Sequence, residues 1–343
     1  MARQQRIGIL FGTFDPVTRS QVDWFLKVLE TGWPDQLLIL PVPSCPGFSC
    51  NADAEDRWKM LVAACTRDKR LIPCRIALDQ GYDDTGRLFS AVKKAWSGSK
   101  LYSVSDDGSL VKPEFRLCPA GAVPDTDPEN LLSIPVLEYC RCKGLYGMPG
   151  KLDHIDSWMD RLFGALKPRR YAHSLSVAWT AKRLALVHGL DPLKAEQAGL
   201  LHDCAKCLSL EEMQRIAREH GLTDDPRFLE NAGLLHSLVG EQVAKDLYGM
   251  NDPDVLEAIR YHNTGHEGMS RLAMCVCLAD SIEPLRFGYP LLDIVRPIAD
   301  VCLERALLVS LEKTAEHVLS MGSYLHPRTE NTIRWLETLP ENR

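Results

Sequence analysis

The sequence lacks the features that would mark a membrane, secreted or nucleic-acid-binding protein. No apolar run among its 343 residues approaches the roughly 18 to 20 residues of a membrane span. Its 40 basic and 46 acidic residues give a net charge of −6, so no general attraction to nucleic acid or anionic membranes is expected. The first residues pass directly into a strand-like segment without a signal-peptide cleavage site. We therefore expect a cytoplasmic protein without nucleic-acid or membrane partners.

Paired cysteine motifs and early histidines are also missing. The twelve cysteines are scattered and lack the repeated CxxC spacing of a zinc ribbon, so we expect most of them to be reduced core thiols. The closest pairs are Cys140/Cys142, Cys204/Cys207 and Cys275/Cys277. All ten histidines lie between His154 and His326. The first 150 residues therefore contain no imidazole chemistry.

Two composition patterns divide the chain into domains at 1–150 and 151–343. The first domain alternates apolar runs with turn residues, which predicts a parallel, Rossmann-like α/β sheet. Its expected strands cover 6–12, 36–43 and 100–105, and its expected helices cover 20–30 and 53–65. A Pro- and Gly-rich loop at 118–135 leads into a short helix at 136–147.

The second domain is predicted to be an all-α bundle, because start and stop signals of helices recur along it. Aspartate before proline indicates a helix start, a Ser–Glu pair three residues apart indicates a capping box, and glycine indicates a helix end. These signals are Asp191-Pro192, Asp252-Pro253, Ser209 with Glu212, Gly189 and Gly221.

The segment GTFDPVTRSQ, residues 12–21, resembles the phosphate-binding motif of the nucleotidyltransferase superfamily, especially nicotinate-nucleotide adenylyltransferases with GTFDPxHxGH. PVPSCP, AEDRWKML and IPVLEYCRCKGLYG extend the resemblance weakly over about 150 residues. It implies a nucleotidyltransferase fold in which a helix N-terminus holds nucleotide phosphates.

Two catalytic elements of that family are absent. Gln21 stands where the family has a histidine that stabilises departing pyrophosphate, and Ser20 replaces a glycine. The family's ISSTxIR motif has no counterpart before the last helix of the domain. We therefore expect a domain that has kept its shape without the reaction, as a scaffold, a dimerisation surface or a nucleotide-binding remnant. A homodimer is left open.

Histidines and aspartates in the second domain form a pattern that predicts a metal site. Each is expected on a different helix or helix end, from which a bundle can direct them to one interior point. Their donors are nitrogen and oxygen, which suit iron, manganese, cobalt or zinc. The expected ligands are His173, His202, Asp203, His236, His262 and Asp280. Singly, each histidine is more commonly structural, and His154, His188, His220, His317 and His326 are taken as such.

We expect two ions bridged by Asp203. His173, His202, Asp203 and Asp280 would hold one, and His236 and His262 would complete the second. Such a pair, about 3.5 to 4 Å apart, lowers the pKa of a bridging water and holds a phosphate oxygen for attack. The pattern therefore predicts hydrolysis of a phosphoanhydride.

The order H…HD…H…H…D resembles the HD hydrolase superfamily. The segments YAHSLSVAWTAKRLA, AGLLHDCAK, LLHSLVG, AIRYHNTGHEGMS, LADSIEPLR and LHPRTENTIRWL resemble the bacterial symmetrical bis(5′-nucleosyl)-tetraphosphatases over about residues 168–337. This resemblance implies cleavage of diadenosine tetraphosphate, a small nucleotide substrate, into two ADP by an iron-dependent HD domain.

Further residues are candidates for binding and acid–base roles. Lys206 lies one helical turn beyond the His202-Asp203 pair, and the forked donors of arginine match phosphate oxygens. The substrate-binding candidates are Lys206, Arg260, Thr264 and Arg286. Asp203, Lys206 and His266 are the catalytic candidates, with His266 as a general acid. His266 replaces the arginine of the family's HTTGR segment, which leaves the substrate less certain than the metal site.

Three alternatives stay open at this point. An HD hydrolase could act on a guanosine polyphosphate or a nucleoside triphosphate instead. The first domain could act as a nicotinate-nucleotide adenylyltransferase, although Gln21 argues against it. Both domains could also be non-catalytic nucleotide sensors, which the full set of ligand candidates disfavours.

Overall fold

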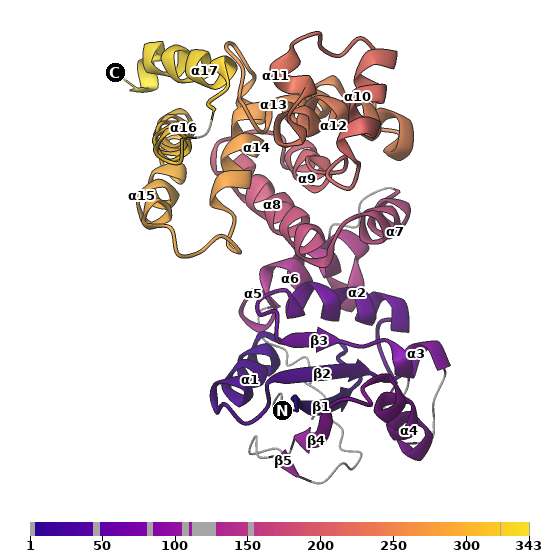
Figure 1. Ribbon diagram of the computed structural model, residues 1–343. Coiled ribbons are helices and arrows are strands. Elements are labelled where there is room, and N and C mark those ends of the chain that lie inside the picture. The colour runs from indigo at the N-terminus through magenta and orange to yellow at the C-terminus, as the bar shows by residue number, and fades with distance from the viewer. Residues whose placement is uncertain are drawn as a thin grey trace. The chain divides into compact units, whose positions relative to one another are not determined.

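The computed structural model describes residues 4–43, 49–80, 85–104, 110–111, 128–149, 154–322 and 324–342 (Figure 1). Its chain divides into unit 1, Met1–Asp156, and unit 2, Ser157–Arg343. The expected boundary at Gly150 and the loop at 118–127 lie outside the described residues. No described helix combines the length and hydropathy needed to span a membrane.

Unit 1 is built on a five-stranded sheet in the order β3-β2-β1-β4-β5. Strands β1 to β4 run parallel and β5 runs antiparallel to β4. Their bounds are β1 Arg6–Gly12, β2 Gln36–Pro41, β3 Leu71–Pro73, β4 Lys100–Val104 and β5 Leu110–Val111. The parallel sheet and the three expected strands are confirmed, whereas β3 and β5 are too short for an apolar pattern to reveal.

Helices cover both faces of this sheet, as the continuous burial of β1 requires. Helices α1 and α2 pack against β2, while α3 and α4 close the core around Ile7, Ile9 and Leu38 (Figure 1). The helices are α1 Arg19–Glu30, α2 Ala54–Cys65, α3 Ile76–Gln80, α4 Thr85–Ala95, α5 Pro128–Leu131 and α6 Ile134–Lys143, followed by a 3₁₀ turn, Leu145–Gly147.

Gln21 takes part in the N-terminal cap of α1. Thr18 caps the helix by accepting a hydrogen bond from the Gln21 backbone N–H, and the Gln21 side-chain oxygen accepts one from the Thr18 backbone N–H. The two residues thus form a reciprocal capping box. The side chain that replaces the family's histidine is therefore tied to its own helix end.

The regular elements in the described residues of unit 2 are all helices, as expected. Its helices are α7 Ile155–Ala165, which begins in unit 1, α8 Pro168–Val187, α9 Pro192–Leu201, α10 Leu210–Glu219, α11 Pro226–Leu229, α12 Ala232–Tyr248, α13 Pro253–Tyr261, α14 Arg271–Ile282, α15 Pro290–Ala299, α16 Leu303–Ser320 and α17 Pro327–Thr338, with a final 3₁₀ turn, Pro340–Asn342. The predicted caps at Asp191 and Asp252 and the Ser209–Glu212 capping box are confirmed.

The core of unit 2 is arranged around α9, which packs against α8, α13 and α14. The approach of α8 and α9 is close because Gly199 lacks a side chain: a Cβ there would lie 2.8 Å from the Ala178 Cα. His202, which caps the C-terminal end of α9, is fully buried.

Candidate metal centre

The six predicted ligands come from five helices of unit 2 and meet in its interior. His173 lies in α8, His236 in α12 and Asp280 in α14. His202 and His262 occupy the C-terminal caps of α9 and α13, with Asp203 directly after the first. His202 is fully buried and Asp203 is 2% exposed.

Asp203 lies between two groups of imidazoles. Its Oδ2 atom is 3.3 Å from His202 Nε2 and 3.9 Å from His173 Nε2. Its Oδ1 atom is 3.2 Å from His236 Nε2 and 3.7 Å from His262 Nε2. One carboxylate therefore presents a different oxygen to each group, which is the geometry of a bridging ligand.

Asp280 completes the first group. Its Oδ1 atom is 3.0 Å from His173 Nε2 and 3.9 Å from His202 Nε2. In the second group, the Nε2 atoms of His236 and His262 lie 3.0 Å apart. All four histidines thus direct Nε2 inward.

The helix ends fix the tautomers of two of these histidines. His202 Nδ1 lies 2.7 Å from the Gly199 carbonyl oxygen, and His262 Nδ1 lies 2.7 Å from that of Ile259. Because a carbonyl oxygen can only accept, each Nδ1 carries a proton and donates it. In the neutral ring, Nε2 keeps its lone pair for a metal ion.

The donor set fits transition-metal ions. Residues His173, His202 and Asp280 form one group of ligand atoms within 4.8 Å of one another, and His202, Asp203 and His262 form another. Among the described residues, His173 Nε2 and His202 Nε2 are buried without a hydrogen bond of acceptable geometry. Buried polar atoms normally have partners, so these nitrogens are suited to a metal.

Protonation states favour ligation at three of the clustered side chains, and a fourth differs. Burial lowers the pKa of His202, and burial likewise lowers the pKa of His236 to about 4, so both rings are neutral at pH 7. Burial opposes ionisation of Asp203, but the neighbouring imidazoles outweigh it and hold the pKa well below its usual range. His173 differs: burial disfavours its charge, yet the neighbouring carboxylates of Asp280 and Glu283 raise its pKa to about 9.

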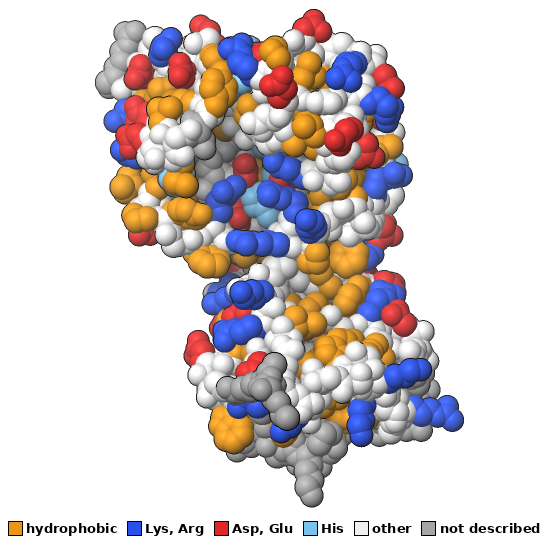
Figure 2. Space-filling view, viewed as in Figure 1, with side chains coloured by type: hydrophobic (Ala, Val, Ile, Leu, Met, Phe, Trp, Pro, Cys, Tyr) orange, Lys and Arg blue, Asp and Glu red, His pale blue; other side chains and the backbone are white. Residues whose placement is uncertain are grey.

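Three cations border the cluster. Arg170 Nη1 lies 2.6 Å from Asp203 Oδ2, and Arg286 Nη2 lies 2.9 Å from Asp280 Oδ1. The pKa of Lys206 is lowered, chiefly by burial and also by Arg170 and Arg286. Figure 2 shows a hollow in unit 2 where histidine surface is bordered by Lys and Arg side chains. The Arg170 and Arg286 side chains that contact the cluster are each 40% exposed, so positive charge beside it reaches the surface and attracts phosphate.

The structure places the other sequence candidates in different contacts. Arg260 pairs with Glu241 at 2.6 Å, and the His266 ring stacks on Tyr261 at 4.4 Å between centroids. The buried Thr264 hydroxyl donates to the Gly265 carbonyl oxygen. Of the proposed binding residues, only Lys206 and Arg286 interact with the cluster in the described part of the chain.

Sequence reasoning missed two residues at the cluster, Arg170 and Glu283. Arg170 precedes His173 by three positions on α8, and Glu283 follows Asp280 by three positions. Residues three apart share a helix face, so a search of that spacing around His173 would have found Arg170. Glu283 caps α14, and its contact with His173 is a tertiary one that spacing does not predict.

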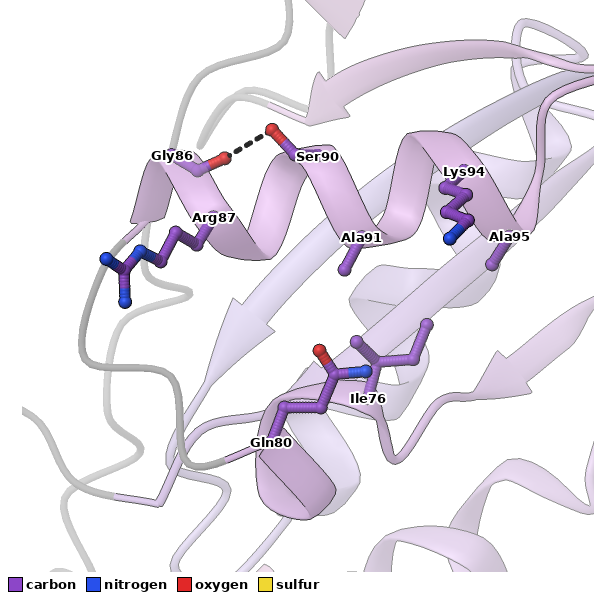
Figure 3. Close-up of a pocket in the computed structure, with 8 residues that line it drawn as sticks. All are labelled: Ile76, Gln80, Gly86, Arg87, Ser90, Ala91, Lys94 and Ala95. Carbon is purple, nitrogen blue, oxygen red and sulfur yellow. Dashed lines mark hydrogen bonds between the residues drawn. The ribbon is translucent and has the colours of Figure 1, made fainter.

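The cavities found elsewhere lack a ligand set. In unit 1, a cavity of about 900 Å³ lies between α3 and α4, where Arg87 and Lys94 are its charged lining residues (Figure 3). In unit 2, a cavity of about 460 Å³ is lined by Trp179, Arg183 and Arg296 among others. Neither lining includes an imidazole, and the second has Asp300 as its single carboxylate.

Comparison with known proteins identifies relatives of the helical unit. The HD domain family model matches residues 170–285. The symmetrical bis(5′-nucleosyl)-tetraphosphatase of Bacillus subtilis is 38% identical over 176 residues, which cover 50% of this chain and 91% of that protein. A crystal structure of a predicted HD superfamily hydrolase involved in NAD metabolism from Clostridium acetobutylicum shares 40% identity and a TM-score of 0.52, covering 53% of this chain and 96% of that one.

A further relative carries two activities in its name. The probable nicotinate-nucleotide adenylyltransferase/Ap4A hydrolase of Mycoplasma genitalium is 31% identical over 190 residues, which are 54% of this chain and 50% of that protein. The residues matched by the HD model include all six clustered side chains.

Proposed function

This chain belongs to the HD-domain hydrolases of the symmetrical bis(5′-nucleosyl)-tetraphosphatase family, and we propose that it cleaves diadenosine tetraphosphate into two molecules of ADP. Water adds to one of the two central phosphorus atoms, and the central anhydride oxygen leaves with the other half. Each product is then ADP, and two protons are released once both new terminal phosphates are ionised.

The observation that carries this proposal is the position of Asp203 between two groups of imidazoles. His173, His202, Asp203 and Asp280 would hold one divalent ion, and Asp203, His236 and His262 a second. When bound, such a pair supplies an activated water and a Lewis acid at the reacting phosphate. Iron fits these nitrogen and oxygen donors, as do manganese, cobalt and zinc.

The chain's own cations would bind and orient the polyphosphate. Arg170 and Arg286 each contact an acidic ligand from the open side, with side chains that are both 40% exposed. An incoming phosphate would replace these carboxylates as the acceptor of hydrogen bonds from the exposed guanidinium groups. Lys206 would add a third positive charge, so the anionic substrate is held before water attacks.

Product identity tests the reaction. Metal-free protein supplied with Fe²⁺ under anaerobic conditions or with Mn²⁺ should convert diadenosine tetraphosphate to ADP alone. Formation of AMP with ATP, or no turnover, would contradict the proposal. Faster cleavage of a guanosine polyphosphate or a nucleoside triphosphate in a competition assay would instead identify that nucleotide as the substrate. His202→Ala should lose activity and bound metal, whereas His220→Ala, at the exposed end of α10, should retain both.

For unit 1 we propose a nucleotidyltransferase-like fold that no longer catalyses adenylyl transfer. The parallel sheet and the name of the Mycoplasma genitalium relative support the fold. The capping box that occupies Gln21 supports loss of the reaction. ATP and nicotinate mononucleotide should therefore yield no pyrophosphate with this protein, and pyrophosphate release above a no-enzyme control would contradict this.

A further inference from the structure

Glu283 contacts the metal cluster from behind its first histidine. The residue caps the C-terminal end of α14, three positions after Asp280, and is 2% exposed. Its Oε1 atom lies 3.1 Å from His173 Nδ1, while Asp280 Oδ1 lies 3.0 Å from Nε2 of the same ring. One helix end thus contacts both nitrogens of His173.

The other three histidines are supported differently. His202 and His262 donate Nδ1–H to carbonyl oxygens of their own helices. His236 Nδ1 is buried and has no hydrogen-bond partner among the described residues. Within this set, His173 alone has a carboxylate from another helix behind it, so the support is specific to one of the two ligand groups.

Glu283 is itself held in place. Its Oε2 atom accepts a hydrogen bond of 2.6 Å from the Leu285 backbone N–H. Arg296, on α15, donates to the backbone carbonyl oxygens of Glu283 at 2.9 Å and Arg286 at 2.8 Å. The carboxylate therefore needs little reorganisation to keep His173 in one orientation.

We infer that Glu283 is a positioning residue that orients His173 and strengthens it as a ligand of the ion held by the Asp280 group. This inference rests on the proposed metal-dependent function. A carboxylate accepts the Nδ1 proton, which leaves Nε2 directed at the ion, and its negative charge increases the electron donation of the ring. Removal of such a partner costs about 10- to 100-fold in metal affinity.

Cobalt titration tests the inference, because Co²⁺ reports each site through its visible absorption. Wild type should bind two equivalents. Glu283→Gln keeps a hydrogen-bond acceptor of the same size without the charge, so it should weaken one equivalent, and Glu283→Ala should weaken the same equivalent by about 10- to 100-fold. Glu337→Gln, at an exposed position of α17, is the matched control and should bind as wild type does.

The pattern of losses separates this role from a general structural one. An effect on one absorption band, with the second equivalent and the thermal midpoint of Glu283→Gln unchanged, supports the inference. Equal weakening of both equivalents, or binding by Glu283→Gln and Glu283→Ala that matches wild type, overturns it. Absence of cobalt binding in wild type instead overturns the proposed function and this inference together.

Discussion

The Oδ1 atom of Asp203 lies 3.2 Å from Nε2 of His236, although Asp203 lies in the turn after α9 and His236 lies in α12. The other Asp203 oxygen faces His202, so the carboxylate joins both halves of the cluster. In the proposed site, this aspartate would contact both ions, whereas each histidine would contact one.

Replacement of Asp203 should therefore remove both ions. Asp203→Asn keeps the shape but leaves one acceptor oxygen, so elemental analysis should find less than one metal per chain. Hydrolysis should fall by more than about 100-fold, since loss of a mere supporting residue already costs 10- to 100-fold. Asp246→Asn, on the exposed side of α12, is the control. Two retained ions would contradict the bridging role.

His236 should affect a single ion. Its Nε2 atom approaches Asp203 Oδ1 and His262, while the Asp280 group lies at the other oxygen. His236→Ala should bind about one equivalent of metal where wild type binds two, with turnover lost because a lone ion cannot clamp both attacking and leaving oxygens. Isothermal titration with Mn²⁺ measures the stoichiometry. Unchanged stoichiometry, or loss of both ions in a folded variant, would argue against separate sites.

Lys206 should set an alkaline limit on activity. Burial lowers its pKa below about 10.4, the pKa of an ordinary lysine. As pH rises, its positive charge is therefore lost earlier than that of an ordinary lysine. If the charge binds phosphate, kcat/KM should decline through that range. Lys206→Arg should move the decline to higher pH, because a guanidinium stays protonated. Lys313→Met, exposed on α16, should leave the profile unaltered, and identical profiles for Lys206→Arg and wild type would exclude the role.

Gly199 should be required for the packing that directs α9 at the cluster. A Cβ would meet the Ala178 Cα at 2.8 Å, and backbone atoms cannot move aside as a flexible side chain can. Gly199→Ala should reduce the free energy of unfolding by about 1 to 3 kcal/mol, the usual cost of overpacking. Chemical denaturation measures it, with Gly164→Ala, where a Cβ meets nothing, as the control. Equal stability of the two variants would contradict the packing argument.

The sequence was sufficient for elements with local signals. Helix starts at Asp191, Ser209 and Asp252 are encoded by side chains that cap their own backbone, and the structure confirms them. Strand β3 has three residues and depends on pairing with β2, which no local pattern reveals. The antiparallel strand β5 likewise depends on pairing with β4.

Whether a residue near a ligand in sequence also lies beside the cluster depends on the side of the helix to which it points. At about 100° per residue, Arg260 is rotated by about 200° from His262 and so points to the opposite side of α13, where Glu241 pairs with it. Arg170 is three positions from His173 and returns to the same face. Glu283 depends on a tertiary contact, so its partner could be identified only with α8 and α14 in place.

Anomalous X-ray diffraction at the metal absorption edge, on crystals of protein loaded with Fe²⁺ or Mn²⁺, would locate the two proposed ions. Two peaks are expected in unit 2, one beside each carboxylate oxygen of Asp203, with His173, His202 and Asp280 around the first and His236 and His262 around the second. The absence of peaks at these side chains, or metal bound elsewhere in a protein that still hydrolyses diadenosine tetraphosphate, would contradict it.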